Sequence, residues 1–332
     1  PAMINLRPLG TLGVTVSEIA FGGAAISGEG RGYGFGRIGE EEALKLLAAC
    51  FDRGINLYDT APVYGFGLSE KRIGRAFRGM RDRVLIATKG GIVWDDRKRI
   101  KIDNHPQVMQ KMLEQSLKDL ETGYVDLYLI HWPDKNTDIR KPMEYLSRAK
   151  EEGKIRAIGL CNSSRDDIHK AAQIDTVDVL QSEFNLFNAS AFSDLREILG
   201  NKKTGFLSWG TLDKGILTGR VTPERTFDDA DARSRAPWWK HEDRTPKYLA
   251  MDKIGALLSD AGYSPLELAL GFVLQYSEVS AALCGIRNIG QLTTAIEALS
   301  HLPPKEILDE AKASADDTLQ SCVQDKKTAG EN

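Results

Sequence analysis

Four polar side chains stand at, or just after, the ends of short apolar runs in the sequence. The runs at residues 55–59, 84–89 and 125–131 end in Asp59, Lys89 and His131, and Tyr64 follows the first run by a short loop. A phenol titrates at about 10, too high for easy proton exchange at neutral pH, and a nearby ammonium lowers that pKa. We predict that Lys89 makes Tyr64 a general acid and that Asp59 keeps Lys89 charged. His131 would orient a carbonyl oxygen or share its proton.

Such a site would reduce a carbonyl group, and this reaction needs a hydride that no side chain can donate. A nicotinamide cofactor is therefore required. Each residue taken alone also has a purely structural interpretation: Asp59 as a helix cap, Lys89 as a strand end reaching for water, His131 as a satisfied polar residue and Tyr64 as a loop aromatic. Catalysis is favoured only if the four side chains converge.

The elements that would bring them together are parallel strands, because each run is short, mostly apolar and separated from the next by a helical pattern. Parallel strands place their carboxyl ends on one face. Eight strand–helix units, after a hairpin over residues 6–19, predict a (β/α)8 TIM barrel; alternation alone would also allow a doubly wound sheet. The expected strands are 20–23, 55–59, 84–89, 125–131, 155–162, 177–183, 205–209 and 281–286.

Two segments depart from this rhythm within what we expect to be a single domain spanning residues 1–332. The long loop after the seventh strand, about residues 218–248, contains five arginines and the pair Trp238–Trp239. Long loops in compact domains are usually functional or disordered, so we interpret this insert as a lid over cofactor or substrate; the alternative is a surface excursion anchored by its tryptophans. The C-terminal segment, about 303–332, predicts a helix from Lys305 to about Leu319 and then a tail.

The composition argues for a small-molecule enzyme. The 44 basic and 47 acidic residues nearly balance, which argues against a nucleic-acid or anionic-membrane partner. No apolar run reaches the roughly 18 residues of a membrane span, and the N-terminus lacks the pattern of a secretion signal. The four cysteines form no CxxC pair and have no histidine at metal-ligand spacing. We expect free thiols, no metal site and a cytoplasmic location.

One glycine motif invites a wrong interpretation. Residues 34–39, Gly-Phe-Gly-Arg-Ile-Gly, fit the GxGxxG pattern of dinucleotide-binding sheets. That pattern needs a strand before it and a helix N-terminus that accepts phosphate, whereas a glycine-rich stretch precedes this motif and three glutamates, residues 40–42, follow it. We therefore place it on the rim of the active site, where Tyr33 or Phe35 could touch substrate; the alternative is a flexible rim loop without such a contact.

Several longer motifs together make the chain resemble the aldo-keto reductase superfamily. They begin with Gly-Ile-Asn-Leu-Tyr-Asp-Thr-Ala-Pro-Val-Tyr-Gly at residues 54–65 and span the chain from Leu6 to about Leu302 in the family's order. The likeness is greatest to bacterial reductases with a long insert after the seventh strand and to potassium-channel β-subunits. The other matching segments are residues 88–91, 124–133, 158–162, 181–185 and 215–219.

The resemblance implies an NADPH-dependent reductase of aldehydes or ketones with Tyr64 as proton donor. Channel subunits often lack a histidine at position 131, so His131 favours an active enzyme over a regulatory, cofactor-binding subunit, which is the alternative. Cys161 stands where the family usually has serine, which would weaken one contact because a thiol hydrogen-bonds poorly. The implied cofactor residues are Gly23, Asn162 and Gln181 near the nicotinamide, Trp209 stacked on it, Gly210, Leu212, Gly215 and Arg220 along the pyrophosphate, and Gly285, Arg287 and Gln291 around the adenosine 2′-phosphate.

The basic residue at position 287 favours NADPH, with NADH also possible. Tyr33, Trp94 and Trp132 suggest an aromatic wall for a small-molecule carbonyl or alcohol substrate. Keto-sugar reduction and the reverse oxidation of an alcohol both remain open, because loops rather than the fold set the substrate. A non-redox barrel enzyme using Lys89 as a Schiff base is a third possibility, disfavoured because a charged lysine is a poor nucleophile. The sequence does not reveal the oligomeric state.

Overall fold

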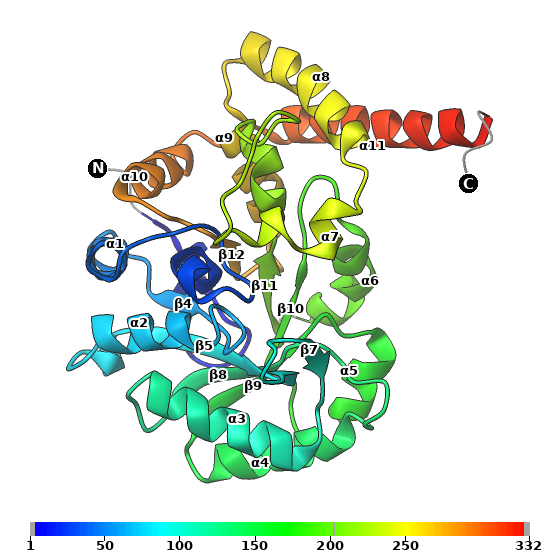
Figure 1. The fold of residues 1–332 in the computed structure, drawn as a ribbon. Coiled ribbons are helices and arrows are strands. Elements are labelled where there is room, and N and C mark those ends of the chain that lie inside the picture. Colours follow the sequence, from blue (N-terminus) through cyan, green and yellow to red (C-terminus); the bar gives the residue numbers. More distant parts are fainter. Residues whose placement is uncertain (1–3, 202, 329–332) are drawn as a thin grey trace.

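A computed structural model describes residues 4–201 and 203–328, and its centre is a closed barrel of eight parallel strands wrapped by helices (Figure 1). The order around the barrel is β3, β4, β5, β8, β9, β10, β11 and β12, with β12 pairing back onto β3. The predicted (β/α)8 barrel is therefore confirmed, and the doubly wound sheet is excluded. The barrel strands are β3 (Ile19–Gly22), β4 (Leu57–Asp59), β5 (Leu85–Gly90), β8 (Val125–Ile130), β9 (Ile155–Cys161), β10 (Val179–Glu183), β11 (Gly205–Trp209) and β12 (Ala281–Cys284).

The helices between the strands form the outer layer, and two of them begin with a full capping box. Ser164 and Asp167 start one helix, and Ser264 and Glu267 start another, so that side chains satisfy the first free backbone N–H groups. The helices of this layer are α1 (Glu40–Asp52), α2 (Leu68–Ala76), α3 (Pro106–Asp119), α4 (Arg140–Glu151), α5 (Arg165–Ala171), α6 (Ser190–Leu199), α9 (Pro265–Leu274) and α10 (Ile289–Ala298).

The strands bury both faces, one inside the barrel and one against the helices. On β5, Ala87 belongs to the apolar cluster inside the barrel, and Ile86 belongs to the cluster beneath the helices. Successive side chains of a strand point to opposite sides, so the assignment of these two residues fixes the direction of the rest. Lys89 must then point inward and Thr88 outward, towards the helix layer.

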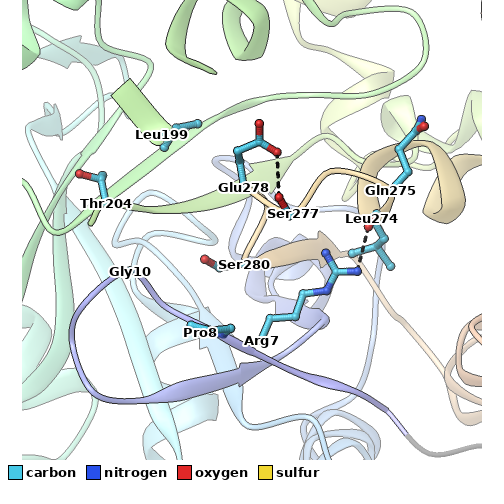
Figure 2. A pocket seen from close by; sticks show the side chains of 10 residues that line it. All are labelled: Arg7, Pro8, Gly10, Leu199, Thr204, Leu274, Gln275, Ser277, Glu278 and Ser280. Atoms are coloured by element: carbon cyan, nitrogen blue, oxygen red, sulfur yellow. Dashed lines mark hydrogen bonds between the residues drawn. The ribbon is translucent and has the colours of Figure 1, made fainter. Parts of the chain in front are cut away.

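The N-terminal hairpin, β1 (Leu6–Pro8) with β2 (Thr15–Ser17), closes the end of the barrel where the strands begin. Its Leu9 and Val16 extend the interior cluster. Figure 2 shows Arg7 reaching the carboxyl end of α9, where its guanidinium donates to the carbonyls of Leu274 (2.8 Å) and Val279 (3.2 Å). The contact with Leu274 satisfies a carbonyl group that a helix end leaves without a partner, and the contact with Val279 ties the hairpin to the loop before β12. The hairpin predicted over residues 6–19 is thus a plug that leaves the opposite end open.

The structure adds elements that the sequence analysis did not predict. A short hairpin, β6 (Ile92–Trp94) with β7 (Ile100–Ile102), follows β5, and the insert after β11 contains the short helix α7 (Pro237–Lys240) and runs into α8 (Thr245–Ala261). The C-terminal helix α11 spans Lys305–Thr328, longer than expected, and packs along α8 (Figure 1). Residues 329–332 of the predicted tail lie outside the described residues. Within the described ranges, no helix combines the length and apolarity needed to cross a membrane.

Candidate active site

Strand alternation directs the predicted site residues into the open end of the barrel. On five strands, an aliphatic residue of the interior cluster stands two positions before the residue that reaches the open end. These aliphatic residues are Leu57 on β4, Ala87 on β5, Leu129 on β8, Val179 on β10 and Leu207 on β11. The next inward positions carry polar or aromatic groups instead of aliphatic ones. They are Asp59, Lys89, His131, Gln181 and Trp209, joined by Cys161 at the end of β9.

The ammonium of Lys89 is the centre of this site. It lies 2.6 Å from Asp59 Oδ2, 2.9 Å from the carbonyl oxygen of Thr60 and 3.3 Å from the Tyr64 hydroxyl. Its side chain is fully buried, and that of Asp59 is 3% exposed. A buried charge is tolerated only when it is paired and hydrogen-bonded, and both conditions hold for this pair. The Tyr64 ring stands edge-on to His131, with centroids 6.0 Å apart, so the four predicted residues converge.

Burial and charge oppose one another at the phenol. Burial raises the pKa of Tyr64 to about 12, and the Lys89 charge acts in the opposite direction without cancelling it. The expectation that Lys89 would make the phenol more acidic than it is in water is therefore wrong, although the Lys89 charge does lower the pKa as predicted. Tyr64 consequently carries its proton at neutral pH, which is the state a proton donor needs.

The side chains of Lys89 and His131 also have defined charge states at neutral pH. Burial acts to lower the pKa of Lys89, but the charge of Asp59, the nearby Tyr64 and Cys161 and the hydrogen bond to Asp59 together outweigh it, so the net pKa is raised and the ammonium stays charged. Burial, helped by the Lys89 charge, lowers the pKa of His131 well below its ordinary value. His131 is therefore a neutral imidazole, suited to hydrogen-bonding a carbonyl oxygen and not to sharing an extra proton.

Beside these residues, the amides expected at the nicotinamide belong to a hydrogen-bond network. Gln181 Nε2 donates to Asp59 Oδ1 at 2.8 Å, so Gln181 also fixes the carboxylate that holds Lys89, a link the sequence analysis missed. Asn162, held in a left-handed conformation (φ 56°), donates to the His131 carbonyl at 3.1 Å and accepts from Trp209 Nε1 at 2.8 Å. Burial raises the pKa of the Cys161 thiol to about 12, so it remains neutral.

The segment expected along the pyrophosphate follows β11 and turns sharply. Asp213, Lys214 and Gly215 have φ values of 42°, 55° and 100°, and a Cβ on Gly215 would lie 2.7 Å from a Val221 methyl group. Lys214, which the sequence analysis did not single out, is the only basic residue between positions 210 and 219, and that was a usable signal. Its ammonium lies 2.7 Å from Glu183 Oε1. Gly210 and Leu212 lie in the same turn; Arg220 is exposed at its end.

The segment expected at the adenosine phosphate lies between β12 and α10. Gln291 Oε1 accepts the backbone N–H of Arg287 at 2.9 Å, so the two predicted residues are joined. The Arg287 Nε is buried without a hydrogen-bond partner in the described chain. A buried donor of this kind invites an acceptor, and a phosphate oxygen suits a guanidinium well. Gly285 is exposed nearby, and Gly23 packs under Asp59 and Ser69, where a Cβ would come within 2.7 Å of both. The residues present therefore fit a phosphorylated dinucleotide.

Two of the three predicted substrate residues pack near the phenol. Tyr33, Trp94 and Phe66 share an apolar cluster with Tyr64, and Phe66, missed by sequence reasoning, stacks at a tilt on Trp94 with centroids 4.8 Å apart. Tyr33 also stacks on Trp238 of the insert at 6.2 Å. Trp132, the third, is 40% exposed, next to His131 in the chain but outside that cluster.

A separate hollow of about 460 Å³ lies beneath the hairpin at the opposite end of the barrel (Figure 2). The charged side chains that line it already have partners within the protein: Arg7 donates to the carbonyl of Leu274, and Glu278 accepts from Arg196 at 2.8 Å. In barrels of this type the strand-start end contributes stability and the strand-finish end contributes chemistry. The end that holds Asp59, Tyr64, Lys89 and His131 is thus the candidate active site.

The family model described as "Aldo/keto reductase family" matches residues 18–315, nearly the whole chain. The chain belongs to the aldo/keto reductase family. Among curated members, the aldo-keto reductase YhdN of Bacillus subtilis (strain 168) is 32% identical over 94% of this chain and 93% of its own length. The NADH-specific methylglyoxal reductase of Escherichia coli (strain K12) is 29% identical over 88% and 93%.

Solved aldo-keto reductase structures agree with the architecture. The glycerol dehydrogenase AKR11B4 of Gluconobacter oxydans superposes with a TM-score of 0.79 at 30% identity, over 95% of this chain and 94% of the other. Membership of the family makes this chain an NAD(P)H-dependent oxidoreductase, as the resemblance implied.

Proposed function

We propose that this aldo-keto reductase reduces a small aldehyde or ketone with NADPH and that Tyr64 is the general acid. The observation that carries the proposal is the chain of contacts from Asp59 through the Lys89 ammonium to the Tyr64 hydroxyl, 2.6 and 3.3 Å long. Tyr64 would give its proton to the carbonyl oxygen, and Lys89 would stabilise the phenolate left behind. A bound reduced nicotinamide supplies the hydride.

His131 and the amides of Asn162 and Gln181 would set the geometry of the reaction. A neutral imidazole edge-on to Tyr64 can donate a hydrogen bond to the same carbonyl oxygen and hold it beside the phenol. Asn162, Gln181 and Trp209 would hold the nicotinamide at the strand ends. Residues 210–220 would carry the pyrophosphate, and Arg287 with Gln291 the 2′-phosphate. Tyr33 and Trp94 would line the substrate side, with Trp132 at the rim.

Cofactor choice and substrate are the finer parts of the proposal. A relative named as NADH-specific and another named for NADP⁺ show that both preferences occur among similar proteins, so the support for NADPH is the uncompensated arginine at position 287. Relatives named for methylglyoxal reduction, L-galactose oxidation and glycerol oxidation suggest small oxygenated substrates and either reaction direction. A panel of such compounds, followed by NADPH or NADH absorbance, would identify the substrate class. No turnover with any of them would favour a regulatory subunit.

The test of the acid is Tyr64→Phe. We expect kcat to fall by about 10²–10⁴-fold, the usual contribution of a general acid, with NADPH still bound. Tyr124→Phe is a matched control, because that ring lies at the start of β8 between the guanidinium groups of Arg81 and Arg156, at 4.2 and 4.0 Å. Turnover by Tyr64→Phe within a few-fold of the parent would remove Tyr64 from the role of acid.

A further inference from the structure

The glycine motif at residues 34–39, excluded as a dinucleotide fingerprint, still needs a physical reason for its glycines. Gly34 packs against Gly28, where a Cβ would lie 2.6 Å from the neighbouring Cα. Gly39 has an ordinary φ of −63°, and a Cβ there would meet nothing within 4 Å. Gly36 differs from both: its φ is +84°, and a Cβ would lie 2.8 Å from the guanidinium nitrogens of Arg287.

The contact at Gly36 joins two segments that are about 250 residues apart in sequence. Arg287 follows β12, while Gly36 lies in the loop between β3 and α1. The strands β12 and β3 are hydrogen-bonded neighbours, and α1 packs beside α10 (Figure 1). Arg287 Nη2 donates to the Arg37 carbonyl at 2.6 Å, and its planar head lies directly on the Gly36 backbone. The β3–α1 loop therefore forms a seat for this guanidinium.

Because only backbone groups of the β3–α1 loop hold the guanidinium of Arg287, its positive charge is not neutralised. In the described chain, no carboxylate lies within 4.0 Å of Arg287, although many other arginines here are paired with one. One of its donors, Nε, is buried without a partner. A carboxylate would have fixed the side chain and also neutralised it. A carbonyl fixes it and leaves a full positive charge with unused donors, which suits a dianionic phosphate.

We propose that Gly36, through the Arg37 carbonyl and its own missing side chain, is a specificity-determining residue that positions Arg287 for the 2′-phosphate of NADPH. This inference rests on the proposed use of NADPH. It adds that preference for NADPH over NADH is set by the β3–α1 loop as well as by the segment after β12. A side chain at position 36 displaces the guanidinium, which is the mobile end of a flexible side chain, and the phosphate loses its partner.

The experiment measures dissociation constants of NADPH and NADH, by quenching of tryptophan fluorescence, for four variants and the parent protein. We expect Arg287→Ala to reduce the preference for NADPH by about 10–100-fold, the value of charge-assisted hydrogen bonds. Gly36→Ala should reduce it by about 5–10-fold with little change for NADH. Gly39→Ala, with an open Cβ position, should change neither by more than about twofold. In the double variant, Gly36→Ala should add nothing to Arg287→Ala.

The outcomes separate this inference from the proposed function. If Arg287→Ala leaves the preference unchanged, the NADPH assignment and the inference both fall. If Arg287→Ala lowers it while Gly36→Ala behaves like Gly39→Ala, the inference alone falls. Equal weakening of both cofactors by Gly36→Ala would mean general loop strain and would also overturn it. Should Gly36→Ala not fold, Gly36→Asn takes its place, because asparagine accepts a positive φ more readily and still places a Cβ against Arg287.

Discussion

Two consecutive residues of β5, Thr88 and Lys89, meet buried carboxylates on opposite sides of the barrel wall. Inside, Asp59 accepts from Lys89 at 2.6 Å and from Gln181 at 2.8 Å, so both of its oxygens are bonded. Outside, Glu70 of α2 accepts from the Thr88 hydroxyl at 2.6 Å, and in the described chain its Oε2 has no hydrogen-bond partner. Both side chains belong to buried residues.

The two buried carboxyl groups differ in the charge that surrounds them. Burial raises the pKa of Glu70 from its ordinary 4.5 to about 7, and the hydroxyls of Thr88 and Ser116 and the charge of Lys89 offset this rise only in part. Glu70 is therefore largely protonated through the mildly acidic range. Asp59 instead has an ammonium in contact. A buried charge is expensive unless it is paired, and the ammonium of Lys89 pairs with Asp59 beside the phenol that the proposed chemistry uses.

Replacement of Lys89 should have the largest effect on both activity and stability. Lys89→Met leaves Asp59 buried without its cation and Tyr64 without its positive neighbour. We expect kcat to fall by about 10²–10³-fold and the free energy of unfolding to fall by about 3–5 kcal/mol, the cost of breaking a buried pair. Steady-state kinetics and urea denaturation measure the two effects.

Lys150→Met is the control for this substitution. Lys150 lies 3.2 Å from Asp178 near the start of the barrel strands, and its side chain is 29% exposed. We expect less than about 1 kcal/mol of destabilisation and unchanged turnover. If Lys89→Met kept both stability and kcat, the interior pair would be no more important than this outer one.

Replacement of Glu70 by a neutral residue should change how the stability of the protein depends on pH. The folded pKa of about 7 exceeds the ordinary 4.5, so between these values the folded protein holds a proton that the unfolded chain has released. Stability from this group is therefore full below about pH 4.5, declines as pH rises, and is constant above about pH 7. Glu70→Gln removes that decline and should be relatively more stable at pH 8 than at pH 5, by up to about 3 kcal/mol. Thermal unfolding at both pH values, compared with the parent, measures the difference; parallel stability curves would contradict it.

The residues that face the interior of the barrel could be predicted from the sequence. The alternation of side chains along a strand, and the position where the strand ends, determine which of them reach the open end of the barrel. Asp59, Lys89 and His131 each close an apolar run, and the regular spacing of runs and helices gave the barrel. Their convergence followed from parallel strands alone. The contact of Gln181 with Asp59 did not follow, because it depends on which strands face each other across the interior of the closed barrel.

The outside of the wall and the loops were harder to predict. Glu70 stands on an amphipathic helix where a glutamate usually faces solvent, so nothing in the local pattern marks it as buried. The seat of Arg287 on Gly36 requires two loops to meet across about 250 residues. The net rise of the Tyr64 pKa was missed for another reason: the sequence supplies the neighbouring charge but not the extent of burial, and burial is the larger effect here.

The smallest expected effect comes from Thr88→Val, which changes the outer face of β5 and leaves Lys89 in place. Valine keeps the β-branched shape that suits a strand and removes only the hydroxyl that Glu70 accepts. We expect a loss of about 1 kcal/mol in the free energy of unfolding, larger at pH 8 than at pH 5.5 because a hydrogen bond to an ionised carboxylate is the stronger one. We expect kcat to stay within about twofold of the parent, since the two faces of the strand contact different acids. Urea denaturation at the two pH values and steady-state kinetics test both statements. A tenfold fall in kcat would mean that the outer carboxylate acts on the catalytic lysine through the strand, and the two sides of the wall could then no longer be treated as independent.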